Sequence, residues 1–196
     1  MKIVGVTGGI GSGKSVVCRI FEQLNIPVYE ADAEAKMLYE KYPELKQSIR
    51  ELISEEAIDK NGNINRKKLA EIVFNDDVKL ASLNKLVHPI VKWDFENWID
   101  SHKGFPYLIK EAAILFESGA NKQCDLVIAV ISPLELRIER IRQRDKKTKA
   151  EIEKIIATQL SDEELIKRSD FVIYNDERQM LVPQVLKIHG EILANV

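Results

Sequence analysis

The stretch that decides the fold is Gly-Gly-Ile-Gly-Ser-Gly-Lys-Ser at Gly8–Ser15. It follows the strand-like run Ile3–Val6 and precedes a helical pattern, which is the context that a phosphate-binding P-loop requires. Glycines let backbone N–H groups turn inward around an anion, and the positive end of the following helix faces the same charge. The stretch therefore predicts a P-loop that binds the phosphates of a nucleoside triphosphate.

Within this loop, two side chains have predicted roles in binding phosphate and metal. We expect Lys14 to reach the β- and γ-phosphates, and the Ser15 hydroxyl to coordinate the Mg²⁺ ion that bridges them. The alternative, a glycine-rich turn without a ligand, is disfavoured because the strand and helix that flank the loop are both present. The predicted nucleotide-binding residues of the loop are Gly9, Gly11, Ser12, Gly13, Lys14, Ser15 and Val16.

Four further short runs rich in valine and isoleucine alternate with helical patterns along the chain. They are found at residues 26–29, 107–109, 126–131 and 171–174. Nearly continuous apolar runs of this length are typical of parallel strands buried on both faces, which helices connect. The sequence therefore predicts an α/β fold: a P-loop NTPase-type open parallel sheet of five strands, flanked by helices, with its ligand at the carboxyl ends of the strands.

The helical segment between the second and third strands is too long to be a simple crossover between two parallel strands. We interpret it as a helical insertion that holds an acceptor substrate. The predicted organisation is a nucleotide-binding core at residues 1–32, 105–135 and 165–196, a helical substrate domain at 33–104, and a lid at 136–164, forming one continuous structural unit.

An arginine-rich helix is expected after the fourth strand. Ser132 and Pro133 suggest an N-cap followed by proline at the first helical position. Arg137, Arg140 and Arg144 follow at spacings that place them on one helix face. A solvated basic helix is the simpler interpretation. The position of this helix after a sheet strand in a P-loop protein favours a lid that contacts phosphate.

One acidic residue follows the second strand at the edge of the sheet where the phosphates should lie. Asp32 could accept the proton of an attacking hydroxyl, a role that phosphoryl transfer often gives to aspartate. It could equally be an acid that only stabilises the first turn of a helix. The position of Asp32 alone favours neither of these two interpretations over the other.

Composition excludes several classes of protein. The chain has 196 residues, a formal net charge of −2 and 45% hydrophobic residues, which is ordinary for a globular protein and argues against a nucleic-acid groove. It contains no run long enough to cross a bilayer and no secretory signal, so we expect a cytoplasmic protein with no membrane partner. Cys18 and Cys124 match no metal spacing and are expected to be reduced, at least half-buried thiols.

Beyond these patterns, the chain resembles the dephospho-coenzyme A kinase family almost from end to end. The matching stretches are Val6–Ser15, Ala31-Asp32, Gly62–Leu69 with Arg66, His88-Pro89, Leu115-Phe116-Glu117, Gln143-Arg144-Asp145, Gln159, and Asp170–Ile173 with Asn175. The chain departs from the family pattern at Val16, Glu30, Glu111 and Ala113. None of these departures removes a group that catalysis needs, and the longer side chain of Glu111 could reach Mg²⁺ through water.

The resemblance implies transfer of the ATP γ-phosphate to the ribose 3′-hydroxyl of dephospho-coenzyme A, with Mg²⁺. It implies that Asp32 is the catalytic base and contacts the acceptor. Lys14 and Arg140 would offset the charge on the transferred group.

The resemblance also implies contacts with the two substrates outside this centre. Arg144 and Asn175 would contact the nucleotide. Arg66 and His88 would contact the acceptor, although His88 could equally fix a helix end. ATP and dephospho-coenzyme A are the expected partners of a monomer or weak homo-oligomer.

Three other functions are compatible with a P-loop in general. A nucleoside monophosphate kinase shares the P-loop, the aspartate and the arginine lid, and differs in its acceptor. A non-catalytic P-loop module is less expected because Lys14, Ser15, Asp32 and Arg140 are all present. A regulatory GTPase would need an Asn-Lys-x-Asp segment, and the run that begins at Asn84-Lys85 lacks the aspartate.

Overall fold

The computed structural model describes residues 1–146 and 148–195, apart from the side chains of Lys36, Phe74, Asn84 and His88. The chain divides into two compact units. The first unit comprises Met1–Asp32 and His102–Val196, and the second comprises Ala33–Ser101.

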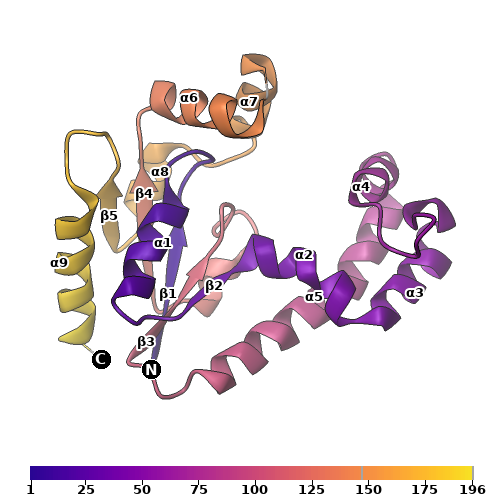
Figure 1. Cartoon of the computed structure of the whole chain (residues 1–196), viewed down its shortest axis with the longest axis horizontal. Coiled ribbons are helices and arrows are strands. Elements are labelled where there is room, and N and C mark those ends of the chain that lie inside the picture. The colour runs from indigo at the N-terminus through magenta and orange to yellow at the C-terminus, as the bar shows by residue number, and fades with distance from the viewer. Residues whose placement is uncertain (147, 196) are drawn as a thin grey trace. The chain divides into compact units, whose positions relative to one another are not determined.

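The first unit is built on a parallel sheet with the P-loop strand at its centre. Its strands are β1 (Lys2–Thr7), β2 (Val28–Glu30), β3 (Tyr107–Glu111), β4 (Leu126–Ile131) and β5 (Phe171–Tyr174). Their order is β2-β3-β1-β4-β5, and every neighbouring pair is parallel (Figure 1). The predicted five-stranded parallel sheet is confirmed.

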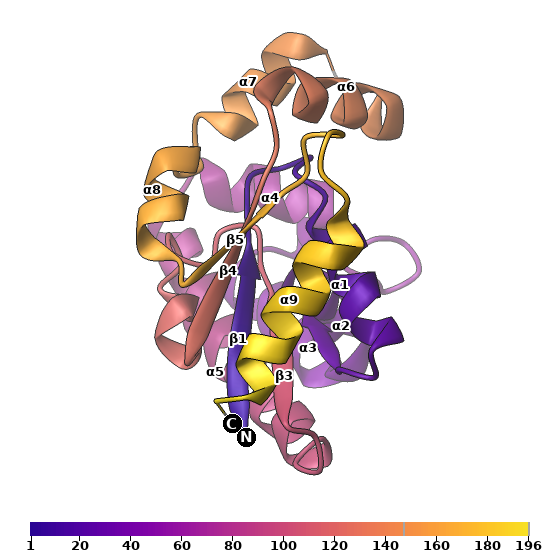
Figure 2. The same ribbon diagram turned by 90° about the vertical axis from the view of Figure 1, so that its left-hand side faces the viewer.

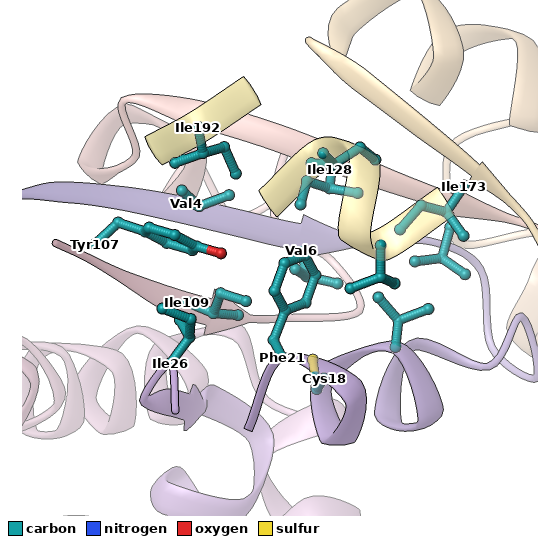
Figure 3. Close-up of a cluster of buried hydrophobic side chains, with 14 residues drawn as sticks. Val4, Val6, Cys18, Phe21, Ile26, Tyr107, Ile109, Ile128, Ile173 and Ile192 are labelled. Atoms are coloured by element: carbon teal, nitrogen blue, oxygen red, sulfur yellow. The ribbon is translucent and has the colours of Figure 1, made fainter. Parts of the chain in front are cut away.

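One face of this sheet is covered by helices α1 (Lys14–Gln23) and α9 (Leu181–Leu193), and Figure 2 shows the two helices beside each other. Phe21 of α1 and Ile192 of α9 are fully buried against Val4 and Val6 of the central strand (Figure 3). Helix α1 therefore starts directly at the P-loop and is fixed by its apolar face. This packing fixes the position of the N-terminus of α1, which is the end that would face a bound anion.

The opposite face is covered by the segment after β3, by the short helix η2 (Ala120–Gln123) and by α8 (Asp162–Arg168). Leu165 of α8 is buried with Ala129 and Ile131 of β4. Because both faces are covered, β4 is buried along nearly its whole length, as its apolar sequence predicts. Cys18 is buried, Cys124 is half-buried, and both are free, as expected.

Helices α6 (Leu134–Asp145) and α7 (Lys149–Ile156) follow β4 and lie beyond the carboxyl ends of the strands (Figures 1 and 2). The prediction that Ser132 caps α6 is wrong. The N-cap is Pro133, which makes no side-chain cap, and Ser132 is fully buried with its hydroxyl bound by Arg140. Thr148 is the N-cap of α7 and forms a capping box with Glu151.

The second unit is helical. It contains most of α2 (Ala31–Lys41), then α3 (Pro43–Leu52), the short helix η1 (Glu55–Ala57), α4 (Arg66–Phe74) and α5 (Asp77–Ser101). Its buried core consists of Leu38, Leu45, Ile49, Ile53, Ala57, Leu69 and Val73. Among the residues that the structure describes, no helix is both long and apolar enough to cross a membrane.

Candidate phosphate-binding site

The backbone carbonyls of the P-loop are all occupied by hydrogen-bond donors of the protein itself. Three of them are bound within the loop and its helix. The Gly8 carbonyl accepts from Lys14 Nζ at 3.0 Å, and the Gly9 carbonyl accepts from Ser12 N–H at 3.1 Å. The Gly13 carbonyl accepts from the N–H groups of two residues in the first turn of α1, at 3.0 and 3.2 Å.

The other three carbonyls are bound by side chains from distant segments. Arg137 Nε donates to the Ile10 carbonyl at 3.0 Å. Arg140 Nη1 donates to the Gly11 carbonyl at a longer 3.4 Å. Asn175 Nδ2, just after β5, donates to the Ser12 carbonyl at 2.8 Å. Since the C=O and N–H of one planar trans peptide point in opposite directions, the contacts at Ile10 and Ser12 direct the N–H groups of Gly11 and Gly13 to the other side.

Four backbone N–H groups of the P-loop and the start of α1 have no acceptor among the residues that the structure describes. They belong to Gly11, Gly13, Lys14 and Ser15. A backbone whose carbonyls are bound by protein donors and whose N–H groups lack acceptors can bind an anion. The N-terminus of α1 adds to the positive potential there. The local geometry therefore fits the phosphate chain of a nucleotide.

Two glycines in the loop are required by their backbone conformation and their neighbours. Gly8 has a φ of +150°, and a Cβ there would lie 2.3 Å from the Val130 carbonyl oxygen. Gly13 has a φ of +95°, and a Cβ there would lie 2.1 Å from Asn175 Nδ2. Any other residue at either position would therefore have a strained backbone, and its Cβ would clash with a neighbouring atom.

Lys14 lies among carboxylates at this edge of the sheet. It is 9% exposed, and its Nζ is 3.7 Å from Glu111 Oε1. Burial lowers the pKa of Lys14, while the charges of Glu111 and Asp32 act in the opposite direction. Burial likewise raises the pKa of Glu111; Lys14 opposes this shift, and Asp32 and Glu30 reinforce it.

The sheet register explains why these acids meet. Glu30 ends β2 and pairs with Glu111, which ends β3. Helix α2 begins at the next residue, so that Asp32 is exposed in its first turn and its charge acts on both Lys14 and Glu111. The three carboxylates therefore give this edge a negative field around the P-loop lysine.

The three arginines of the predicted lid face have different environments. Arg137 is only 5% exposed and forms an ion pair with Asp162 at 3.2 Å. Arg140 is half-buried and bonds Ser132 Oγ and Glu177 Oε1, each at 3.0 Å. Arg144 is exposed and pairs with the adjacent Asp145 at 2.7 Å.

Arg137 therefore contacts the P-loop, as Arg140 does. Of the two, only Arg140 was predicted from the sequence to belong to the site. Sequence reasoning placed Arg137 on the arginine face but not in the site. Its spacing from Arg140 was the only signal that could have found it.

The donor atoms at this edge suit magnesium. The Ser15 hydroxyl is exposed at the first turn of α1, and the neighbouring side chains are carboxylates, which are the hard oxygen donors that Mg²⁺ prefers. Within residues 1–146 and 148–195, no three His, Cys, Asp or Glu side chains form a group that could hold a metal.

The predicted acceptor residues belong to the second unit. Arg66 begins α4 and lies 3.9 Å from Glu40 across a half-exposed ion pair. His88 lies within α5, one residue before Pro89, and its side chain is outside the described residues. Val16, predicted to bind nucleotide, lies in α1 and is 46% exposed.

A central β1 strand, a glycine loop with outward carbonyls and a buried lysine define a P-loop nucleotide-binding protein. The family model for dephospho-CoA kinase matches residues 2–180. The chain is 44% identical over 174 residues to the dephospho-CoA kinase of Fusobacterium nucleatum, covering 89% of each chain. It is 38% identical over 185 residues to that of Bacteroides fragilis, covering 94% of this chain and 90% of the relative. The chain belongs to the dephospho-CoA kinase family.

Solved structures agree with this assignment. A Thermus thermophilus protein superposes with a TM-score of 0.81 at 30% identity, covering 100% of this chain and 97% of the other. The dephospho-CoA kinase of Campylobacter jejuni gives a TM-score of 0.71 at 29% identity, covering 98% of both chains. The family predicted from the sequence and the class of enzyme, a kinase, are therefore confirmed.

Proposed function

We propose that this protein transfers the γ-phosphate of ATP to the ribose 3′-hydroxyl of dephospho-coenzyme A. A bond forms between the 3′-oxygen and the γ-phosphorus, and the bond from that phosphorus to the β–γ bridging oxygen breaks. The hydroxyl proton passes to a base of the protein, and ADP leaves. Family membership supports the choice of acceptor.

The observation that supports phosphate binding most strongly is the orientation of the P-loop backbone. Every carbonyl from Gly8 to Gly13 is bound by a donor of the protein, which leaves N–H groups available for phosphate oxygens. In addition, Ser12 Oγ is buried with no hydrogen-bond partner among the described residues. A buried unpaired hydroxyl costs about 1–3 kcal/mol, and a phosphate oxygen would relieve that cost.

Asp32 is the proposed base. It is exposed, so a substrate hydroxyl can reach it, and its charge already acts on Lys14 and Glu111. A carboxylate that receives the hydroxyl proton at the carboxyl edge of the sheet raises the nucleophilicity of the attacking oxygen. Asp32 can act as the base only when the ribose of the acceptor lies beside the γ-phosphate.

Lys14 and Arg140 are the proposed counter-charges for the transferred group. Lys14 is held by Gly8 and Glu111 at 3.0 and 3.7 Å, so it needs little rearrangement to bind phosphate oxygens. Arg140 already bonds the P-loop at Gly11, and its contact with the exposed Glu177 can be exchanged for a phosphate. Fixed positive groups aimed at developing charge are the main source of catalysis in phosphoryl transfer.

Magnesium is the proposed metal, held by the Ser15 hydroxyl together with the nucleotide's phosphates. When bound, Mg²⁺ neutralises charge on the β- and γ-phosphates. Glu111 lies 3.7 Å from Lys14 and can hold a water molecule beside the metal rather than the metal itself.

We assign the remaining predicted contacts by family resemblance. Residues 33–104 would form the substrate domain, in which Arg66 and His88 bind the acceptor. Residues 136–164 would form a lid whose Arg144 contacts the nucleotide, and residues 1–32, 105–135 and 165–196 would form the core. We further propose a cytoplasmic protein that acts as a monomer or weak homo-oligomer.

The function is tested by an acceptor panel. The protein is incubated with ATP and Mg²⁺ and with dephospho-coenzyme A, AMP, CMP or no acceptor, and ADP release is followed with mass spectrometry of the products. The proposal predicts turnover with dephospho-coenzyme A alone and a product heavier by one phosphate on the ribose. Turnover with a nucleoside monophosphate instead would keep the P-loop kinase and discard this acceptor.

A further inference from the structure

One residue at the tip of the P-loop is held on both of its backbone groups by side chains from outside the loop. Arg137 Nε donates to the Ile10 carbonyl at 3.0 Å, and Gln159 Oε1 accepts from the Ile10 N–H at 2.8 Å. Arg137 precedes helix α7 and Gln159 follows it. The two segments that flank α7 therefore meet at a single residue of the loop.

The Arg137 contact decides which way a phosphate-binding N–H points. The Ile10 carbonyl and the Gly11 N–H belong to the same planar peptide and point in opposite directions. Arg137 holds that carbonyl on one side, so the Gly11 N–H, which has no acceptor among the described residues, is directed to the other. Glycine rotates freely about its backbone, so this peptide would otherwise turn over easily.

The Arg137 side chain is buried rather than exposed on the surface. It is 5% exposed, and its second guanidinium nitrogen bonds Asp162 of α8 at 3.2 Å. A Cβ on Gly9 would lie 2.0 Å from Nη2, so the guanidinium lies directly against the loop. Such burial of a charge is costly unless it is paired and hydrogen-bonded, and Arg137 is both.

We propose that Arg137 is a positioning residue for the nucleotide's phosphates, which fixes the Ile10–Gly11 peptide so that the Gly11 N–H faces the anion. Gln159 secures the preceding peptide from its other side. The inference rests on the proposed binding of ATP phosphates by the P-loop. It assigns the arginine a task different from that of Arg140, because Arg137 acts through the backbone and does not need to touch the nucleotide.

The test compares Arg137→Met with Arg142→Met, which removes an exposed arginine of the same helix. Calorimetry measures the Kd of inorganic tripolyphosphate and of ATP, and steady-state kinetics measures KM for each substrate. Arg137→Met should weaken both phosphate ligands about tenfold or more, because a hydrogen bond from a charged donor is lost. The KM for dephospho-coenzyme A and the binding by Arg142→Met should stay at the wild-type level.

A second variant separates positioning from folding. Arg137→Lys keeps a buried positive charge for Asp162 but lacks the guanidinium Nε, so it should fold and still bind tripolyphosphate several-fold more weakly than the wild type. Wild-type affinity in a folded Arg137→Lys or Arg137→Met would overturn the inference. Wild-type protein that fails to bind tripolyphosphate would instead contradict the proposed phosphate site itself.

Discussion

Asn175, the first residue after strand β5, donates its side-chain amide to the Ser12 carbonyl at 2.8 Å. The Ser12 carbonyl and the Gly13 N–H share one peptide, so this contact turns the Gly13 N–H toward the phosphate side. Asn175 also occupies the space that a side chain on Gly13 would need. The end of the last strand therefore helps to set the shape of a loop at the other end of the chain.

The Asn175→Asp variant tests this relationship. A carboxylate cannot donate to the Ser12 carbonyl and adds negative charge beside the phosphates, so the KM for ATP should rise about tenfold. Asn195→Asp, at the exposed C-terminal end, is the matched control and should leave the KM for ATP unchanged. An Asn175→Asp enzyme with wild-type KM for ATP would show that other contacts hold the loop.

Gly8→Ala should damage both stability and nucleotide binding. The positive φ of Gly8 strains any other residue by about 1–3 kcal/mol. The added Cβ would also meet the Val130 carbonyl at 2.3 Å. Gly104→Ala is the control, because nothing lies within 4 Å of its Cβ position. Urea unfolding and ATP titration of both variants check this, and equal behaviour of the two would contradict the observed conformation of Gly8.

Glu111→Gln should change the pH dependence of stability. Burial raises the pKa of Glu111 above its ordinary value of 4.5, so the folded protein binds this proton more tightly than the unfolded chain. The stability that Glu111 contributes is therefore fully present below pH 4.5 and is lost as the pH rises through the raised pKa.

Glutamine stays neutral at every pH, so Glu111→Gln should exceed the wild type in free energy of unfolding at pH 8. The difference should shrink toward pH 4.5. Urea unfolding of the ligand-free proteins across this range measures it. A wild type that is the more stable protein at pH 8 would mean that the attraction between Glu111 and Lys14 outweighs burial.

Arg140→Lys should lower kcat far more than it changes the KM for ATP. Lysine lacks the planar fork with which Arg140 bonds Gly11 and Ser132 through Nη1 and keeps Nη2 for a phosphate oxygen. Loss of a preorganised donor for developing charge lowers kcat by about 10²–10³. Arg142→Lys on the exposed side of the same helix is the control. Weaker ATP binding with an unchanged kcat would rule out the catalytic role of Arg140.

The sequence predicts most of the sheet because its strands are continuous apolar runs, whose burial on both faces leaves little choice of structure. β2 is shorter and lies later than expected, at Val28–Glu30, because Pro27 lacks the N–H that a strand pairing needs. Lys14 and Ser15 were predictable because the P-loop pattern fixes their place relative to the helix.

Other features of the site depend on tertiary contacts that the pattern does not contain. Ser132 has the residue type of a helix cap, but at the end of β4 it is buried and its hydroxyl serves Arg140 instead. Arg137, Arg140 and Arg144 look alike in the sequence. Only the packing of α6 against the loop and α8 separates a buried positioning residue from an exposed surface charge.

If Asp32 and the P-loop form one catalytic centre, the Asp32→Asn variant should lose phosphate transfer while it keeps substrate binding. The measurement is the single-turnover rate of phosphate transfer to dephospho-coenzyme A, with the Kd of both substrates determined by calorimetry. Loss of a general base should lower the rate by about 10²–10⁴ while both substrates still bind. A rate near that of the wild type would show that Asp32 is not the base and is only a helix-terminal acid.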